Sequence, residues 1–289
     1  MSRKTDSHSV LVLGAHASGK TTFIAQLLGR LERIQTGRLR ARAAPASLTP
    51  YREALESLEE GRAPEHTSST LFADTPIPLI HDVAGPLDLV WPEYPGESLQ
   101  QIVTQRKVPE KWYARLQASE VWLLFLRLST TFVPEDILSR RILPIVKPKS
   151  GPAAEPEEET SKQTLLVELL QMLLHLRAAS TAAPLRQPVL GVVLSCFDEI
   201  QARDTHRPPI GHLAERLPLL AEFIRSSWSP SSHLVLGLSS SGQPLSHREP
   251  NEVFIFQGPE HQGYVVLPDG RDDPDLTLVV SLALDLLYA

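Results

Sequence analysis

Short continuous apolar runs alternate along the chain with segments whose apolar residues recur at helical spacing. The runs are expected to be buried strands and lie at 10–13, 121–128, 188–195 and 233–238. Helices are predicted over 20–33, 49–60, 110–117, 164–176 and 213–228, with a last buried helix from about 274. Strands that alternate with helices in this way predict a mostly parallel sheet with helices on both faces.

Three segments depart from this alternation. Strand-like runs at 76–83 and 87–91 are joined by Ala84-Gly85-Pro86, a turn signal that predicts an antiparallel hairpin. Residues 129–163 include a Pro-, Gly- and Glu-rich stretch that cannot build a core, so we expect a flexible insertion there. Two β-like runs, 253–256 and 264–267, predict a small β insertion within 250–270. The expected organisation is a single domain over 1–289.

Composition excludes several classes of protein. Apolar residues make up 42% and charged residues 21% of the 289, which argues against a disordered, fibrous or disulfide-stapled chain. A net charge of -6 argues against a protein built mainly to bind nucleic acid phosphates. The single cysteine, Cys196, cannot form an intramolecular disulfide. We see neither an export signal nor a run of roughly 20 apolar residues, so a cytoplasmic location is expected.

The most specific motif is Gly14-Ala15-His16-Ala17-Ser18-Gly19-Lys20-Thr21, which matches G-x-x-x-x-G-K-[ST] between a predicted strand and a predicted helix. Its glycines let the backbone wrap a phosphate, its N–H groups supply positive potential, and Lys20 adds a cation. Thr21 would offer its hydroxyl to Mg²⁺. The candidate phosphate-binding residues are Gly14, His16, Ala17, Ser18, Gly19, Lys20, Thr21 and Thr22.

Two later loops hold candidates for recognising a base, Ser195-Cys196-Phe197-Asp198 and Ser239-Ser240-Ser241-Gly242. Here the chain resembles GTPases of the TRAFAC class of P-loop proteins, whose corresponding loops read N/T-K-x-D and S-A-K. The resemblance implies that Asp198 accepts from the N1 and N2 groups of guanine, with Cys196, Ser239 and Ser240 beside the base. Guanine presents two adjacent donors there and adenine does not, so a carboxylate favours guanine. Cys196 replaces the usual lysine, and Ser240 the usual alanine.

The same resemblance places the family's D-x-x-G loop at Glu93-Tyr94-Pro95-Gly96. It implies that Glu93 holds Mg²⁺ through a water, that Gly96 senses the γ-phosphate, and that Glu97 orients the attacking water. The switch hydroxyl that closes over Mg²⁺ is expected among Thr67, Ser68, Ser69 and Thr70, and the spacing from Gly61 and Pro64 favours Thr67. A solvated turn is the alternative interpretation of Glu97 and Thr67. The candidate catalytic residues are thus Glu97, Lys20 and Thr67, and the candidate metal ligands are Thr21, Glu93 and Thr67.

The resemblance implies an α/β P-loop NTPase three-layer fold, mostly parallel, with one antiparallel hairpin strand. The expected function is a switch that binds GTP or GDP with Mg²⁺ and presents its switch loops to protein partners. Slow hydrolysis of GTP to GDP and phosphate is compatible with this function. Such a partner could be another GTPase or an activating protein, and the similarity is greatest to bacterial double-GTPase-like proteins. Two alternatives stay open: an ATP-using kinase or ATPase, and a scaffold that binds nucleotide without hydrolysing it.

Overall fold

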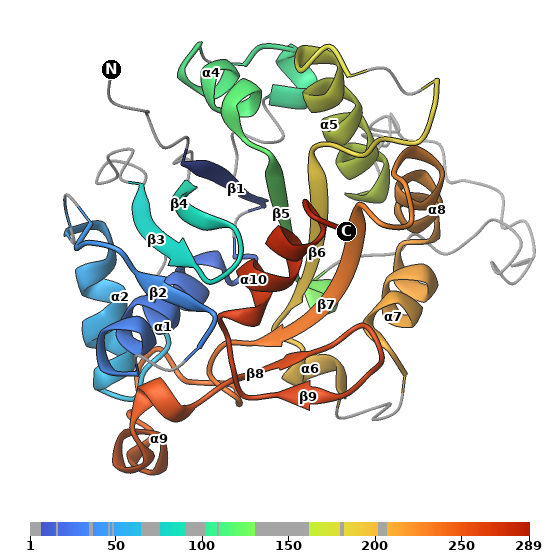
Figure 1. Ribbon diagram of the computed structural model, residues 1–289. Helices are drawn as coiled ribbons and strands as arrows, with labels where there is room; N and C mark the ends of the chain where they lie inside the picture. Colours follow the sequence, from blue (N-terminus) through green and yellow to red (C-terminus); the bar gives the residue numbers. More distant parts are fainter. Residues whose placement is uncertain are drawn as a thin grey trace, which may run out of the picture.

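The computed structural model describes residues 7–15, 17–34, 37–45, 47, 49–64, 76–90, 102–108, 110–130, 162–179, 182–201 and 207–289. These residues form a nine-stranded sheet of order β2-β3-β4-β1-β5-β6-β7-β8-β9 (Figure 1). The strands are β1 (His8–Gly14), β2 (Leu39–Ala41), β3 (Ile77–His81), β4 (Gly85–Val90), β5 (Val121–Leu126), β6 (Val189–Ser195), β7 (His233–Ser239), β8 (Tyr264–Val266) and β9 (Asp272–Asp273).

Helices connect these strands and carry most of the remaining described residues. The α-helices are α1 (Lys20–Arg33), α2 (Thr49–Glu59), α4 (Glu110–Ala118), α5 (Lys162–Leu176), α6 (Asp198–Gln201), α7 (Pro209–Arg216), α8 (Pro218–Ser227), α9 (Glu252–Gln257) and α10 (Leu278–Asp285). Two short 3-10 helices are η1 (Leu128–Thr130) and η2 (Pro259–His261). None of the helices in the described ranges has the length and apolar character needed to cross a membrane.

The centre of the sheet is parallel, as the sequence predicts. β1 pairs in parallel with β4 and β5, β5 with β6, and β6 with β7. The expected hairpin is present as antiparallel β3 and β4, although its turn lies at 82–84, two residues before the predicted Ala84-Gly85-Pro86 turn. The α/β three-layer fold is therefore confirmed. Beyond the expectation, β8 is also antiparallel to its neighbour β7, and the short β2 extends the other edge.

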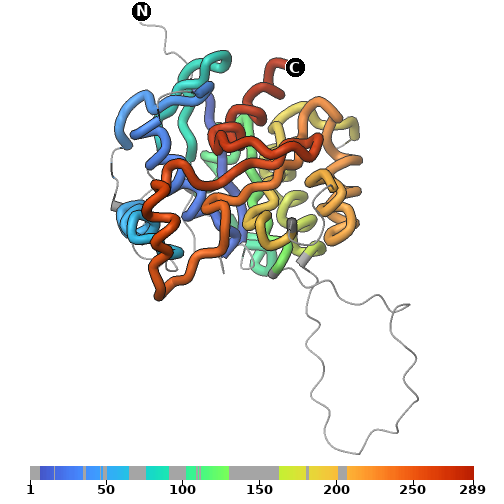
Figure 2. Tube along the Cα trace, turned by 90° about the horizontal axis from the view of Figure 1, so that it is seen from below, coloured from blue at the N-terminus to red at the C-terminus, as the bar shows by residue number. Residues whose placement is uncertain are grey.

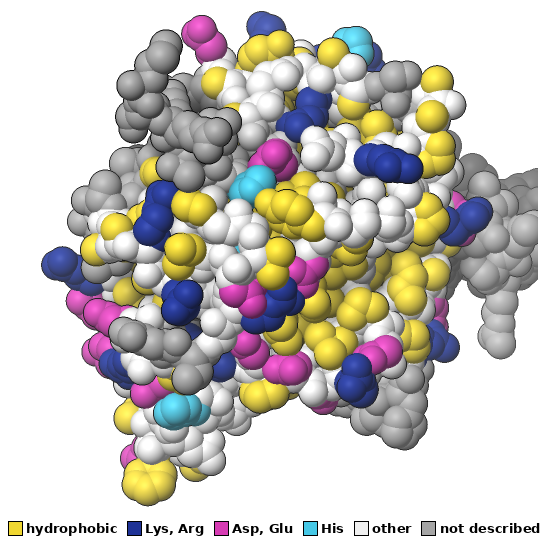
Figure 3. All heavy atoms as spheres, viewed as in Figure 1, with side chains coloured by type: hydrophobic (Ala, Val, Ile, Leu, Met, Phe, Trp, Pro, Cys, Tyr) yellow, Lys and Arg dark blue, Asp and Glu magenta, His cyan; other side chains and the backbone are white. Residues whose placement is uncertain are grey.

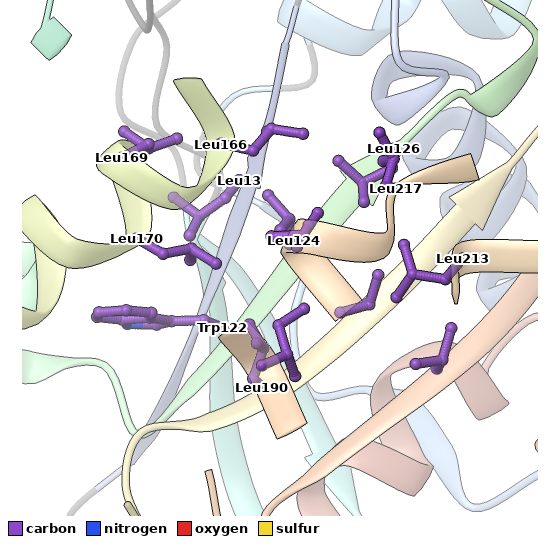
Figure 4. Close-up of a cluster of buried hydrophobic side chains, with 14 of the residues drawn as sticks. Leu13, Trp122, Leu124, Leu126, Leu166, Leu169, Leu170, Leu190, Leu213 and Leu217 are labelled. Atoms are coloured by element: carbon purple, nitrogen blue, oxygen red, sulfur yellow. The ribbon is translucent and has the colours of Figure 1, made fainter. Parts of the chain in front are cut away.

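Alternating side chains of the central strands enter two hydrophobic cores, one on each face of the sheet. In β1, Leu11 and Leu13 face one core whereas Val10 and Val12 face the other, because successive strand residues point to opposite sides. Helices α4, α5, α7 and α8 cover the first face, and α1 and α10 cover the second. Figure 4 shows leucines of the strands and helices gathered in the first core, where Leu13 of β1 lies beside Leu170 of α5.

Several predicted elements differ from the structure. The helix expected over 213–228 is divided into α7 and α8 at Leu217, because Pro218 has no N–H to continue the first helix. Residues 253–256, expected to be β-like, belong to α9, so the expected small β insertion within 250–270 is only partly β-structure. The expected insertion over 129–163 lies almost entirely outside the described residues.

The Arg-rich stretch that begins in α1 forms bonds within the chain. Arg30 donates from Nη2 to the carbonyl oxygen of Gln262 at 2.8 Å, and Arg38 makes a two-point ion pair with Asp285 at 2.5 and 2.7 Å. Further ion pairs are Arg33–Glu59, Arg33–Glu260 and Arg42–Asp88. On the face shown in Figure 3, basic and acidic side chains of the described residues are interspersed. These arginines therefore hold distant segments of the chain together.

We predict that Leu124→Ala lowers the free energy of unfolding by about 2–5 kcal/mol, because it removes a fully buried side chain from the central strand and leaves a cavity. Leu219→Ala, at a position 49% exposed on α8, is the matched control and should change it by less than about 0.5 kcal/mol. Urea unfolding of both variants checks the difference. Equal losses would contradict the assignment of Leu124 to the core.

Candidate nucleotide-binding site

The loop between β1 and α1 requires its glycines. Gly14 has φ +151°, and a Cβ there would lie 2.7 Å from the carbonyl oxygen of Phe125 on the neighbouring strand. Gly19 precedes α1 with φ +73°, a left-handed conformation that glycine adopts without strain. Ala17 also has a positive φ, +55°. The backbone therefore turns sharply at the carboxyl end of β1 and leads into the N-terminus of α1, where unpaired N–H groups favour an anion.

Lys20 points its ammonium group back into this loop. Its Nζ donates to the carbonyl oxygens of Gly14 and Ala15 at 2.7 and 2.6 Å, and to Ser18 Oγ at 2.9 Å. All three partners are neutral oxygens, so they do not compensate the charge. Desolvation therefore lowers the pKa of Lys20 to about 7. A bound phosphate would supply the missing negative charge at this position.

The loop after β6 is anchored on the loop before α1. A Cβ on Gly19 would lie 3.3 Å from Ser195 Cβ and 3.7 Å from Cys196 Sγ. Ser195 Oγ also donates to the carbonyl oxygen of Leu126 at 3.2 Å. Cys196 has a positive φ of +50°, and burial raises the pKa of its thiol to about 11. A raised pKa favours the protonated thiol at neutral pH and disfavours a thiolate nucleophile there.

Asp198 is the first residue of the single-turn helix α6 and is half-buried. Just before it, the N–H of Phe197 donates to the carbonyl oxygen of Leu238 on β7 at 3.0 Å. The Phe197 ring fills the space over Gly237, where a Cβ would lie only 2.7 Å from the ring. The loop that carries Asp198 is thus fixed to the end of β7.

The end of β7 and the loop after it complete this edge of the sheet. Ser239 is fully buried and lies opposite Tyr264 of β8 in the antiparallel pairing. The carbonyl oxygen of Ser240 would lie 2.5 Å from a Cβ on Gly263, so the loop packs closely on the segment before β8. Burial, followed by the charge of nearby Asp198, raises the pKa of Tyr264 to about 12. Tyr264 therefore lies near the predicted base-binding residues, although nothing in its sequence context indicates this.

The structure thus brings together, at the carboxyl ends of β1, β6 and β7, the predicted residues Gly14, Ala17, Ser18, Gly19, Lys20, Thr21, Thr22, Cys196, Asp198, Ser239 and Ser240. The remaining predicted residues lie outside the described ranges, and these are His16, Thr67, Glu93, Gly96 and Glu97. Their roles stay predictions. The meeting of two separate motifs at one edge is what parallel strands with aligned carboxyl ends produce.

A magnesium ion can be tested only against Thr21, because Glu93 and Thr67 are outside the described part of the chain. Thr21 lies in the first turn of α1, directly after Lys20. A hydroxyl combined with phosphate oxygens is a donor set that Mg²⁺ accepts, so the residue fits. The described residues contain no group of three or more His, Cys, Asp or Glu side chains that could hold a metal by themselves. Mg²⁺ would therefore depend on the phosphates for much of its coordination.

Comparison with known proteins gives a family match. A family model described as Double-GTPase 1 matches residues 11–283. No curated protein matches the chain. The expected resemblance to P-loop GTPases, and to double-GTPase-like proteins among them, is therefore confirmed.

Solved structures give more distant similarities. The chain is 11% identical to a bacterial selenocysteine-specific elongation factor, EF-Sec, over 81% of this chain and 26% of that one, with a TM-score of 0.34. For the GTPase-like domain of S. cerevisiae Ski7 bound to GTP, the identity is 12% over 85% of this chain and 46% of that one, with a TM-score of 0.39. For Methanosarcina barkeri Roco2 bound to GDP, the identity is 13% over 81% of this chain and 43% of that one, with a TM-score of 0.28. The chain thus spans between a quarter and a half of the length of these proteins.

We predict that Lys20→Met stabilises the protein without ligand and abolishes nucleotide binding. The pKa of Lys20 is about 7 in the folded state and 10.5 when unperturbed, so between these values the unfolded state binds more protons. Stability without ligand should therefore rise with pH from about 7 to 10. Lys20→Met removes the buried charge, so it should abolish this pH dependence and raise the Tm at pH 7. Thermal melts from pH 7 to 10, with and without GDP, check this.

The control for this prediction is Lys107→Met, which changes an exposed lysine and should leave the pH dependence of Tm unaltered. If Lys20→Met and the unmodified protein change their Tm with pH in the same way, Lys20 does not carry the desolvated charge.

Proposed function

The chain belongs to the Double-GTPase 1 family and is a GTP-binding protein, and from this premise we propose that it works as a magnesium-dependent molecular switch. It binds GTP or GDP with Mg²⁺ and presents its switch loops to protein partners in a nucleotide-dependent way. The observation that carries the proposal is the ammonium group of Lys20, held among neutral oxygens in a loop that contacts the Asp198 loop. The ammonium group of Lys20 suits a polyphosphate, and the carboxylate of Asp198 suits a guanine base.

In this proposal the phosphates lie over the loop of residues 14–21, here called the phosphate loop. The loop N–H groups and the N-terminus of α1 bind the phosphate oxygens, and Lys20 leaves its contacts with the carbonyl oxygens of Gly14 and Ala15 to pair with the phosphates. Thr21 holds Mg²⁺ through its hydroxyl, and the ion when bound neutralises phosphate charge. Because the lysine exchanges neutral partners for anionic ones, binding favours its charged form.

Base selection is assigned to Asp198. A carboxylate accepts two hydrogen bonds, which matches the N1–H and 2-amino donors of guanine and leaves adenine without an equivalent pair. Ser239 and Ser240 lie beside it at the end of β7, and Tyr264 flanks them on β8. Cys196 takes the position of the family's usual lysine as a neutral thiol. The site would thus bind the base with a single charged side chain.

Hydrolysis and the switch are proposed from the resemblance. Glu97 would orient the attacking water, while Glu93 and Thr67 would complete the surroundings of Mg²⁺. A carboxylate at Glu97 would also repel the γ-phosphate, so we expect GTP to be hydrolysed slowly to GDP and phosphate. Partners would bind the loops around 62–70 and 93–105, whose contacts with the γ-phosphate end when GTP is hydrolysed.

Two other functions make different predictions. An ATP-using kinase or ATPase would use the same phosphate loop with a structural Asp198, and it would prefer adenine nucleotides. A scaffold would bind guanine nucleotide without turnover and with no conformational response. The half-buried carboxylate of Asp198 favours the guanine-binding alternative over the first of these, because adenine has no pair of adjacent donors for it.

We predict that GDP with Mg²⁺ binds at least about 100-fold more tightly than ADP, because hydrogen bonds to a charged group contribute about 1.5–3 kcal/mol each. Asp198→Asn should weaken GDP binding and improve binding of xanthosine diphosphate, whose ring has an oxygen where guanine has the 2-amino group. Calorimetric titration of nucleotide-free protein measures all three affinities.

Asp269→Asn makes the same chemical change at an exposed turn and should leave these affinities unaltered. Tighter binding of ADP than of GDP would favour the ATP-using enzyme. Absence of all nucleotide binding would contradict the proposal entirely.

We predict that segments 62–70 and 93–105 exchange amide hydrogens more slowly with a non-hydrolysable GTP analogue than with GDP, because γ-phosphate contacts order them. Hydrogen-exchange mass spectrometry measures both states, and the buried strand β6 serves as an internal reference that should not change. Identical protection of the two segments in both states would favour the scaffold.

A further inference from the structure

A side-chain cluster links the end of β5 to the loop of residues 195–198, here called the base loop, and no motif in the sequence indicates this cluster. Arg127 directly follows β5, and its Nε donates to Glu199 Oε2 at 3.1 Å while Nη2 donates to Glu199 Oε1. The hydroxyl of Ser129 donates to the same carboxylate. Glu199 is the residue after Asp198, so this cluster lies at the edge of the sheet where the nucleotide is proposed to bind.

The geometry and burial of this pair distinguish it from an ordinary surface ion pair. Two parallel N–H donors on one carboxylate fix both distance and orientation. The side chains of Arg127 and Glu199 are only 31% and 23% exposed, so solvent screens the attraction less than it would on an open surface. Burial alone would raise the pKa of Glu199, but the hydrogen bonds from Arg127 and Ser129 hold that pKa below its ordinary value.

The backbone around Asp198 is held by tertiary contacts on both sides of this residue. Helix α6 has four residues, too few to be stable without tertiary contacts. Before Asp198, Phe197 ties the loop to β7 through its N–H and its ring. After Asp198, Glu199 ties it to the end of β5. The candidate base reader is thus held between two anchors on different strands.

The β5 anchor also reaches the phosphate loop. Phe125, two residues before Arg127, pairs with Gly14 across β1 and β5, and its carbonyl oxygen limits the space at Gly14. The same strand end therefore contacts the start of the phosphate loop and, through Arg127, the residue next to Asp198. A change at this pair would alter the position of Asp198 relative to the phosphates without removing either group.

We propose that Arg127 and Glu199 form a positioning pair that sets base selectivity by holding the Asp198 carboxylate at a fixed place relative to the phosphate loop. The inference rests on the proposed function, since it assumes that Asp198 binds guanine. Neither residue of the pair is assigned a contact with the nucleotide. Ser129 assists by fixing the rotation of the Glu199 carboxylate.

Inosine diphosphate is the probe that isolates this effect, because it lacks the 2-amino group of guanine but keeps the same sugar and phosphates. The ratio of IDP to GDP dissociation constants, measured by calorimetry with Mg²⁺, reports how well Asp198 meets that group. We expect Arg127→Ala and Glu199→Gln each to lower this ratio by about tenfold, as for the loss of one charge-assisted hydrogen bond. The double variant should lower the ratio no further than either single variant. Arg127→Lys should lower the ratio less than Arg127→Ala.

Arg38→Ala is the matched control. It breaks a pair of similar exposure, 35% and 32% for Arg38 and Asp285, and should lower Tm without changing the IDP to GDP ratio. A purely structural role for Arg127 would give the same result as this control, with reduced Tm and an unchanged ratio, and would overturn the inference. If Arg127→Ala does not fold, Arg127→Lys and Glu199→Gln, which preserve side-chain size, carry the test.

The outcomes separate this inference from the proposed function. If Asp198→Asn lowers the ratio and the Arg127 and Glu199 variants do not, only the positioning role is overturned. If the unmodified protein binds GDP and IDP equally, Asp198 does not read guanine, and the proposed base selection fails together with the inference.

Discussion

The parallel direction of β1, β5, β6 and β7 is the constraint on which the whole site depends. These strands are hydrogen-bonded in register, so that Gly14 lies opposite Phe125 and Ser195 lies opposite Leu238. Their carboxyl ends must therefore reach the same edge of the sheet. Each strand is buried on both faces by helices, which fixes the register because a shift by one residue would reverse every side chain. The loops that follow have no other place to lie than beside one another.

A second connection runs along the outside of the molecule. The segment between β7 and β8 extends from the end of β7 to the end of α2, as Figure 2 shows. There the N–H of Asn251 donates to the carbonyl oxygen of Gly61 at 3.0 Å, and that of Ala63 donates to Ser246 at 2.9 Å. A Cβ on Gly61 would lie 2.7 Å from the carbonyl oxygen of Asn251, so only glycine allows this approach. The start of the loop expected to contain the switch threonine is thus bonded to the segment between β7 and β8.

The sequence predicts those features that depend on neighbouring residues. The phosphate loop and the buried strands follow from spacing and hydrophobic pattern, which are local. The prediction of β-structure over 253–256 is wrong because a short apolar run suits strand and helix equally, although Asn251 caps helix α9 and Gly258 ends it. Tyr264 and the Arg127–Glu199 pair could not be found because their partners are distant in sequence. Only the folded sheet brings residues 127 and 199 together.

The two loops of the site contain several unfavourable local features. Ala17 and Cys196 are two of the four non-glycine residues with positive φ, and such conformations cost of order 1–3 kcal/mol each. Lys20 adds the desolvation of a cation among neutral oxygens. These costs persist only because the sheet and its two cores determine the loop positions. A polyphosphate would remove the last of these costs by pairing with Lys20, so the unliganded protein is destabilised where the ligand would bind. Nucleotide affinity and folding stability therefore share one energetic origin in this protein.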